Sequence, residues 1–244
     1  AEEAAAAPVP DIAVTSNVGI TSDYRFRGIS QNDRAPSIQG GFDVAFNKVG
    51  LYVGTWGSNV NKWTAGDGSM EWDLYGGYKA EVAGVALDLG AISYLYPNSG
   101  SWKANTQEAY FGLGYGPATF KVSRVLGENY FASTPATSGK SASGTMYYDL
   151  TVAQEIAPKL TASLHAGYTK ASKGIDNAVG ATFSYYDYNF GLAYDLNGFV
   201  LGVKYYVNTL RAGTKSYADA LTAGTGAKSD LGANGFAVSL TRSF

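Results

Sequence analysis

The sequence predicts an all-β fold, a transmembrane antiparallel up-and-down β-barrel with twelve strands as the first choice. Three observations predict it. Apolar and polar residues alternate with period two in about twelve segments, short turns alternate with long polar loops, and the last segment ends on Phe244. A tilted strand of about nine to eleven residues crosses a bilayer. An even strand count, with short periplasmic turns at one end and long extracellular loops at the other, is typical of bacterial outer-membrane barrels.

The composition agrees with this fold class and argues against two others. Glycine makes up 31 of 244 residues, well above the average of about 7% in globular proteins. Charged residues make up 16%, below the average of about 25%. Mean hydropathy is -0.10, and no run approaches the roughly 18 apolar residues of a membrane helix, which excludes a helical membrane protein. The net charge of -2 without a basic stripe argues against nucleic acid as a partner, and none is expected.

Alternation places each expected strand. The clearest segment spans residues 185–195, where Tyr186, Tyr188 and Phe190 share one face while Asp187 and Asn189 share the other. The expected strands are 12–27, 36–47, 50–60, 70–81, 85–96, 107–115, 118–126, 145–156, 160–170, 185–195, 199–208 and 234–244. Counts of ten or fourteen also remain open, because 118–126 is weakly patterned and 209–233 is long.

The connections between these strands alternate strictly in length. Five short turns are expected at 47–49, 82–84, 116–117, 157–159 and 196–198. Six long polar loops are expected at 28–36, 61–69, 97–106, 127–144, 171–184 and 209–233. A soluble β-sandwich has no reason to segregate its loop lengths in this way, and both termini fall on the side of the short turns.

We expect one domain, a single transmembrane barrel over residues 12–244. Residues 1–11 are polar and rich in alanine, which fits a flexible mature N-terminus left after removal of a signal peptide. The absence of Cys is mild support for a cell-envelope protein. The expected location is therefore the bacterial outer membrane.

The C-terminus carries the strongest single signal. Counting back from Phe244, one face of the last segment presents Leu240, Val238 and Phe236, with Arg242 where an apolar residue is commoner. A last strand that ends in an aromatic residue resembles the signal read by the outer-membrane assembly machinery. An open apolar edge strand would promote aggregation in a soluble protein, and pairing with the first strand removes that edge.

A second signal lies in the first sixty residues. Segments 17–31 (NVGITSDYRFRGISQ), 37–41 (SIQGG) and 50–58 (GLYVGTWGS) closely resemble the TorF family of porins. Beyond them the resemblance rests on strand and turn pattern, such as LDLG at 87–90 leading to YLYP at 94–97. The resemblance implies an outer-membrane barrel that acts as a porin.

Alternation also predicts which charged side chains point into the lumen. They number ten acids and five bases with one His, and the excess of acids predicts a weak preference for cations. The expected lumen-lining residues are Asp23, Arg25, Arg27, Asp43, Glu71, Asp73, Lys79, Asp88, Glu108, Lys121, Asp149, Glu155, His165, Asp187, Asp195 and Lys204.

Two functions remain open at this stage. In the first, the lumen is hydrated and conducts small hydrophilic solutes by passive diffusion, gated by loops 127–144 and 211–230. In the second, ion pairs close the lumen and the barrel is structural or adhesive, with loops that bind lipopolysaccharide or a protein partner. Many small inward glycines favour a pore, whereas Arg25 and Arg27 could cross the lumen and block it. The oligomeric state stays open.

Enzymatic activity is not expected. The single His, His165, points inward, whereas a membrane phospholipase would need its Ser–His pair on the lipid side. One His and no Cys leave no credible metal site. No phosphate-binding or dinucleotide-binding glycine motif is present, so no cofactor is expected.

Overall fold

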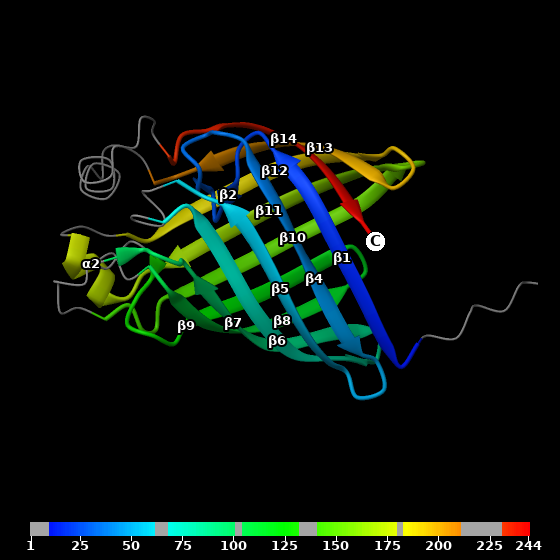
Figure 1. The fold of residues 1–244 in the computed structure, drawn as a ribbon, viewed down its shortest axis with the longest axis horizontal. Coiled ribbons are helices and arrows are strands. Elements are labelled where there is room, and N and C mark those ends of the chain that lie inside the picture. Colours follow the sequence, from blue (N-terminus) through cyan, green and yellow to red (C-terminus); the bar gives the residue numbers. More distant parts are fainter. Residues whose placement is uncertain (1–9, 62–67, 101–103, 132–140, 180–182, 211–230) are drawn as a thin grey trace, which may run out of the picture.

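Twelve antiparallel strands form a closed barrel in the computed structural model, which describes residues 10–61, 68–100, 104–131, 141–179, 183–210 and 231–244. Around the wall the order is β1-β14-β13-β12-β11-β10-β9-β8-β7-β6-β5-β4, so each strand pairs with its sequence neighbours apart from the inserted β2 and β3. Figure 1 shows the strands tilted across the long axis, with the helix α2 (Lys173–Val179) and the long connections at one end and the short turns at the other.

The observed strands confirm the alternation-based boundaries to within one or two residues, except for the first. The wall consists of β1 (Ile12–Thr21), β4 (Ser37–Phe46), β5 (Leu51–Asn59), β6 (Met70–Val82), β7 (Val85–Leu95), β8 (Thr106–Tyr115), β9 (Ala118–Val125), β10 (Met146–Ala157), β11 (Leu160–Lys170), β12 (Tyr185–Asp195), β13 (Phe199–Asn208) and β14 (Gly235–Ser243).

The expected strand 12–27 and the loop 28–36 are wrong in one respect. The wall strand β1 ends at Thr21, and the chain then forms a small separate hairpin from β2 (Arg25–Phe26) and β3 (Ile29–Ser30). Arg27 and Gly28 make its two-residue turn with φ of 48° and 76°, the double positive φ of a tight hairpin turn. Alternation alone did not distinguish a wall strand from a hairpin, because both have period two.

The barrel closes between its first and last strands. Ile20 pairs with Leu240 and Val18 with Arg242, while the backbones of Ser16 and Phe244 exchange two hydrogen bonds of 3.0 and 2.8 Å. The terminal residue therefore takes part in the seam itself. Arg242, the unexpected base in the last strand, lies over the rings of Phe199 at 4.6 Å and Phe244 at 5.2 Å, so its charge faces aromatic rings at the short-turn end.

The short turns are as expected, and their backbone explains their length. Ala83 and Gly84 both have positive φ, at 51° and 79°, and they connect β6 to β7 as a two-residue hairpin loop. Gly198 donates its N–H to Asp195 at 2.7 Å, which fixes the turn between β12 and β13. Such turns match the right-handed twist of the flanking strands.

The outer surface of the wall is apolar. Exposed side chains include Val14, Phe42, Leu164 and Phe190. A water-soluble protein would bury most side chains of this kind, whereas a membrane barrel presents them to lipid. Aromatic rings lie near both ends, and Tyr148, Tyr168 and Tyr186 stack across three neighbouring strands with centroids 6.2 and 4.5 Å apart, as expected of an interfacial belt. No helix in the described part of the chain is both long and apolar enough to cross a membrane.

Three of the inward glycines are covered by tyrosine rings and do not leave empty space, so inward glycines do not by themselves favour a pore. A Cβ on Gly54 would meet the ring of Tyr75 at 2.4 Å, one on Gly90 the hydroxyl of Tyr110 at 2.4 Å, and one on Gly167 the hydroxyl of Tyr147 at 2.2 Å. The tyrosine rings thus lie along the wall over glycines of neighbouring strands. Lumen width is preserved because large rings lie flat, not because side chains are missing.

Gly41→Ala should weaken the barrel, whereas Gly112→Ala should not. A Cβ at Gly41 would meet the carbonyl oxygen of Thr55 at 2.2 Å, a backbone atom that cannot move aside, whereas at Gly112 the nearest atom lies at an ordinary 3.5 Å. Overpacking of this kind costs about 1–3 kcal/mol. Heat-dependent mobility on gels measures barrel unfolding, and equal unfolding temperatures for the two variants would contradict the expected difference.

Candidate functional site in the barrel lumen

The half of the lumen nearest the short turns contains an open cavity of about 740 Å³. Lys79 of β6, Asp88 of β7 and Lys121 of β9 line it together with Asp149 and Thr151 of β10. Both lysines point inward and are nevertheless solvent-exposed. Exposed ammonium groups on an inward face show that this half of the barrel has room for water.

The half nearest the long loops is packed instead. The inward side chains at the loop-side ends of the strands are buried although most are polar. They are Thr21, Ser37, Ser58, Glu71, Asp73, Tyr94, Thr106, Glu108, Ser123, Tyr147, Thr169, Tyr185, Asp187 and Asn208. The β2–β3 hairpin occupies the space among them, so the lumen narrows sharply from one half to the other.

An ion pair at the hairpin turn fixes the hairpin to the wall. Arg27 donates to both oxygens of Glu108 on β8, at 2.8 and 2.7 Å, and both side chains are buried. Burial alone would lower the pKa of the Arg27 guanidinium, but the Glu108 carboxylate raises it well above its usual value. Tyr185 of β12 donates to the carbonyl oxygen of Arg27 at 3.0 Å. The turn is therefore held from two sides of the lumen.

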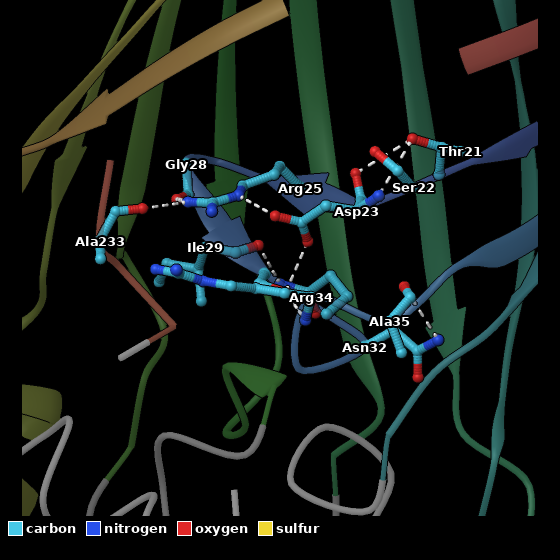
Figure 2. Close-up of polar contacts among 12 residues, drawn as sticks. Thr21, Ser22, Asp23, Arg25, Gly28, Ile29, Asn32, Arg34, Ala35 and Ala233 are labelled. Carbon is cyan, nitrogen blue, oxygen red and sulfur yellow. Dashed lines mark hydrogen bonds and ion pairs between the residues drawn. The ribbon is translucent and has the colours of Figure 1, made fainter. Parts of the chain in front are cut away.

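A second ion pair shapes the hairpin from within. Arg25 donates to Asp23 at 2.7 Å, a contact that Figure 2 shows. Ser30 of the return arm also donates to Asp23, at 2.7 Å. Arg25 also donates to the carbonyl oxygen of Ala233 at 2.8 Å, next to the last strand. Arg25 and Arg27 thus lie on the hairpin and Asp23 lies in the segment that leads into it, so none of the three is on the wall.

Apolar side chains from the loops cover the hairpin on its outer side. Ile29 packs in one buried cluster with Val125, Tyr130, Ile175 and Leu231. Tyr94 and Tyr96 belong to a second cluster that contacts Phe26. Phe131 packs against both clusters. The long loops were expected to be polar, but their described parts contribute to an apolar layer over the lumen. The adjacent aromatic residues Tyr130 and Phe131 are the feature of the sequence that indicates this layer.

Two carboxylates beneath this layer face the hairpin. Glu71 accepts a hydrogen bond of 3.0 Å from Tyr24, and one oxygen of Asp73 has no hydrogen-bond partner among the described residues. Burial, with the negative charge of Glu71 nearby, raises the pKa of the Tyr24 hydroxyl well above its usual value, so Tyr24 remains a donor. The pKa of Tyr96 is raised by the same two causes. Glu71 is therefore bonded to the segment that leads into the hairpin, and both carboxylates are buried away from the open cavity.

His165 lies at the boundary between the two halves. Its Nε2 is 3.1 Å from Asp187 and its Nδ1 is 3.5 Å from Asp149 and 3.1 Å from Thr151. The imidazole is thus one member of an inward polar network. In the described residues no three His, Cys, Asp or Glu side chains gather as a metal site requires.

The remaining predicted lumen residues lie along the wall. Asp43 accepts from Tyr75 at 2.7 Å and Asp88 accepts from Tyr52 at 2.6 Å. Glu155 and Asp195 lie beside the short turns, where they bond to the backbone of Lys159 and Gly198. Sequence reasoning omitted Tyr75, Tyr110 and Tyr147, although the same alternation points them inward. Of the expected gating segments, 132–140 and 211–230 lie outside the described residues.

A family model described as "Bacterial protein of unknown function (Gcw_chp)" matches residues 3–244. Among solved structures, the chain is similar to the NanC porin, with 10% identity, a TM-score of 0.57 and coverage of 94% of this chain and 99% of that one. It is also similar to the KdgM porin in complex with disordered oligogalacturonate, with 7% identity, a TM-score of 0.54 and coverage of 95% and 99%. No curated protein matches. These likenesses show the fold, and the TorF resemblance stays a prediction.

Glu108→Gln should loosen the hairpin without opening the wall. Removing one partner of a buried ion pair costs about 3–5 kcal/mol, and each 1.4 kcal/mol is about tenfold. The amide of Ser30, which donates to Leu231 at 2.9 Å, and that of Gln31, which donates to Tyr24 at 2.7 Å, should therefore exchange at least about a hundredfold faster.

Hydrogen–deuterium exchange measures this, with Glu155→Gln at the exposed rim as the control. Unchanged exchange at Ser30 and Gln31 in Glu108→Gln would show that the ion pair does not hold the hairpin. Faster exchange along β1 and β14 as well would show that the substitution loosens the whole barrel.

Proposed function

The chain belongs to the Gcw_chp family of bacterial proteins of unknown function, and we propose that it is a porin-like outer-membrane channel for passive diffusion of small hydrophilic solutes. The observation that carries this proposal is the hydrated half of the lumen, where inward-facing Lys79, Lys121 and Lys204 are solvent-exposed. In a lumen packed shut by side chains, ammonium groups such as these would be buried in ion pairs.

Three further observations support a channel. The apolar exterior and the closed wall fit a barrel that spans a membrane. The KdgM and NanC porins share this fold over 99% of their chains. The resemblance of residues 17–31 to the TorF porins points the same way. We place the protein in the outer membrane on these grounds, with outer-membrane lipids and lipopolysaccharide as its surroundings.

The β2–β3 hairpin then acts as the constriction of the channel. It fills the loop-side half and is held by Glu108 and Tyr185 of the wall and by Ala233 in the segment before β14. A solute must pass beside the hairpin or displace it, which limits passage to small molecules.

A closed structural or adhesive barrel is the second candidate function, and a specific observation favours it. The two apolar clusters around Ile29 and Tyr96 cover the loop-side end. If this layer never opens, the remaining role lies in the loops, which would bind lipopolysaccharide or a protein partner. Catalysis is not part of either candidate, because the single His, His165, lies inside the lumen, away from the lipid that a membrane phospholipase would cleave.

Purified protein in a planar bilayer should give stable single-channel steps, and replacing residues 24–31 by a short Gly-Ser linker should enlarge them. The enlargement follows from removal of the hairpin. Lys48→Gln, in the exposed turn that joins β4 to β5, should leave the step size close to that of the wild type. Silence from both the wild type and the linker variant, each shown to be folded, would contradict the channel and support the closed barrel.

The same recording under unequal potassium chloride tests the weak cation preference that the inward tally of acids predicts. A reversal potential of anion-selective sign would contradict that preference while leaving the channel intact.

We also propose that the last strand carries the signal for the assembly machinery. Phe236 and Phe244 are exposed on the outer face of β14, at 69% and 66%. Deleting Phe244 should lower the amount of folded barrel in the outer membrane, because it removes both the terminal ring and the backbone pair with Ser16.

Phe244→Ala keeps the backbone pair and separates the two effects. Membrane fractionation with heat-shifted gel mobility measures both variants, with Phe199→Ala, which also contacts Arg242, as the control. Full assembly of both Phe244 variants would contradict an assembly signal at the terminus.

A further inference from the structure

A second, smaller cavity of about 210 Å³ lies directly beneath the hairpin. Arg27, Lys121, His165 and Lys204 line it together with Asp149 and Asp187. Lys121 and Asp149 also line the larger cavity, so the two spaces adjoin. Since a water molecule takes about 30 Å³ in the liquid, the smaller space holds several waters or one small solute.

The acceptors in this lining already have partners. Asp187 accepts from Tyr147 at 3.2 Å and lies 3.1 Å from His165. Asp149 accepts from Thr151 at 3.0 Å and faces the other nitrogen of His165. Both carboxylates are therefore hydrogen-bonded within the wall, which leaves them less free to bind a solute cation.

Two lysines in the lining do not have such partners, and neither does one nitrogen of Arg27, whose other two nitrogens bond to Glu108. Lys204 stands between Gly191 and Ala237 in the register of the neighbouring strands, so no carboxylate lies opposite it. Lys121 lies opposite Asp149, yet neither lysine forms an ion pair within the described part of the chain. The Nε of Arg27 is buried and lacks any acceptor among the described residues. Free donors thus outnumber free acceptors.

We propose that this cavity is a binding site for the carboxylate group of a small organic anion, an inference that rests on the proposed channel for its access route. Lys204 and Lys121 contact the carboxylate, and the Nε–H of Arg27 supplies a third donor from the hairpin turn. Charge-assisted hydrogen bonds from such groups to carboxylates are shorter and stronger than neutral ones. The site lies between the hydrated half and the hairpin, where a solute that enters from the loop side would pause after passing the constriction.

Binding of a carboxylate in this cavity does not determine whether the channel prefers small cations or small anions. Ion selectivity depends on the charge along the whole lumen, including Glu155 and Asp195 near the rim, whereas the site depends on the donors of one cavity. A weakly cation-selective channel can hold such a site.

The test compares glucuronate with glucose, which differ only in the carboxylate, by isothermal titration of the folded protein in detergent. Wild-type protein should bind glucuronate, and glucose should bind at least about tenfold more weakly, the scale of one charge-assisted hydrogen bond. Lys204→Met should weaken glucuronate binding by a similar factor, and Lys204→Arg should restore most of it.

Lys79→Met is the matched control, because Lys79 is also an exposed inward lysine but lines only the larger cavity. It should leave glucuronate affinity unchanged. Equal binding of glucose and glucuronate, or equal losses in Lys204→Met and Lys79→Met, would overturn the proposed site.

Bilayer conductance is recorded on the same preparations to keep the two proposals apart. Conductance without selective glucuronate binding overturns the site and leaves the channel. Selective binding without conductance supports the site and contradicts the channel.

Discussion

Every backbone N–H and C=O in a membrane-spanning segment needs a protein partner, because the hydrocarbon offers none. The seam between β1 and β14 meets this requirement, since Ser16 and Phe244 bond to each other and the pairing continues to Thr21 and Ser239. Without that seam two edges would face lipid. The apolar outer face, the strand count and the position of the C-terminus all follow from closing the wall here.

Closing a twelve-stranded wall creates a lumen wider than side chains alone fill. The chain uses two devices to handle that space. Tyrosine rings lie flat over glycines such as Gly54 and Gly90, which keeps the short-turn half wide. The β2–β3 hairpin and the apolar clusters fill the loop-side half. The Arg27–Glu108 ion pair holds the hairpin against strand β8 of the wall.

The lumen charges divide in the same way. Near the hairpin the carboxylates Asp23 and Glu108 are paired with arginines. Farther down, Asp43 and Asp88 accept hydrogen bonds from tyrosines, and Asp149 and Asp187 lie against His165. The exposed lysines of the hydrated half have no such ion-pair partners within the described residues. The number of inward acids and bases therefore describes the electrostatic potential of the lumen less well than knowing which of these charged side chains form ion pairs or hydrogen bonds.

The sequence by itself determined the wall of this protein. Period-two alternation and turn chemistry are local properties, so they gave the twelve strands, the short turns and the inward direction of residues such as Asp88, His165 and Lys204. The tertiary structure alone decided which segments fill the lumen that the wall encloses. Whether residues 22–30 continue β1 or turn into the lumen depends on Glu108, Tyr185 and Ala233, which are distant in sequence. Alternation gives the direction of a side chain, whereas contact with distant strands decides how far it reaches and which partner it meets.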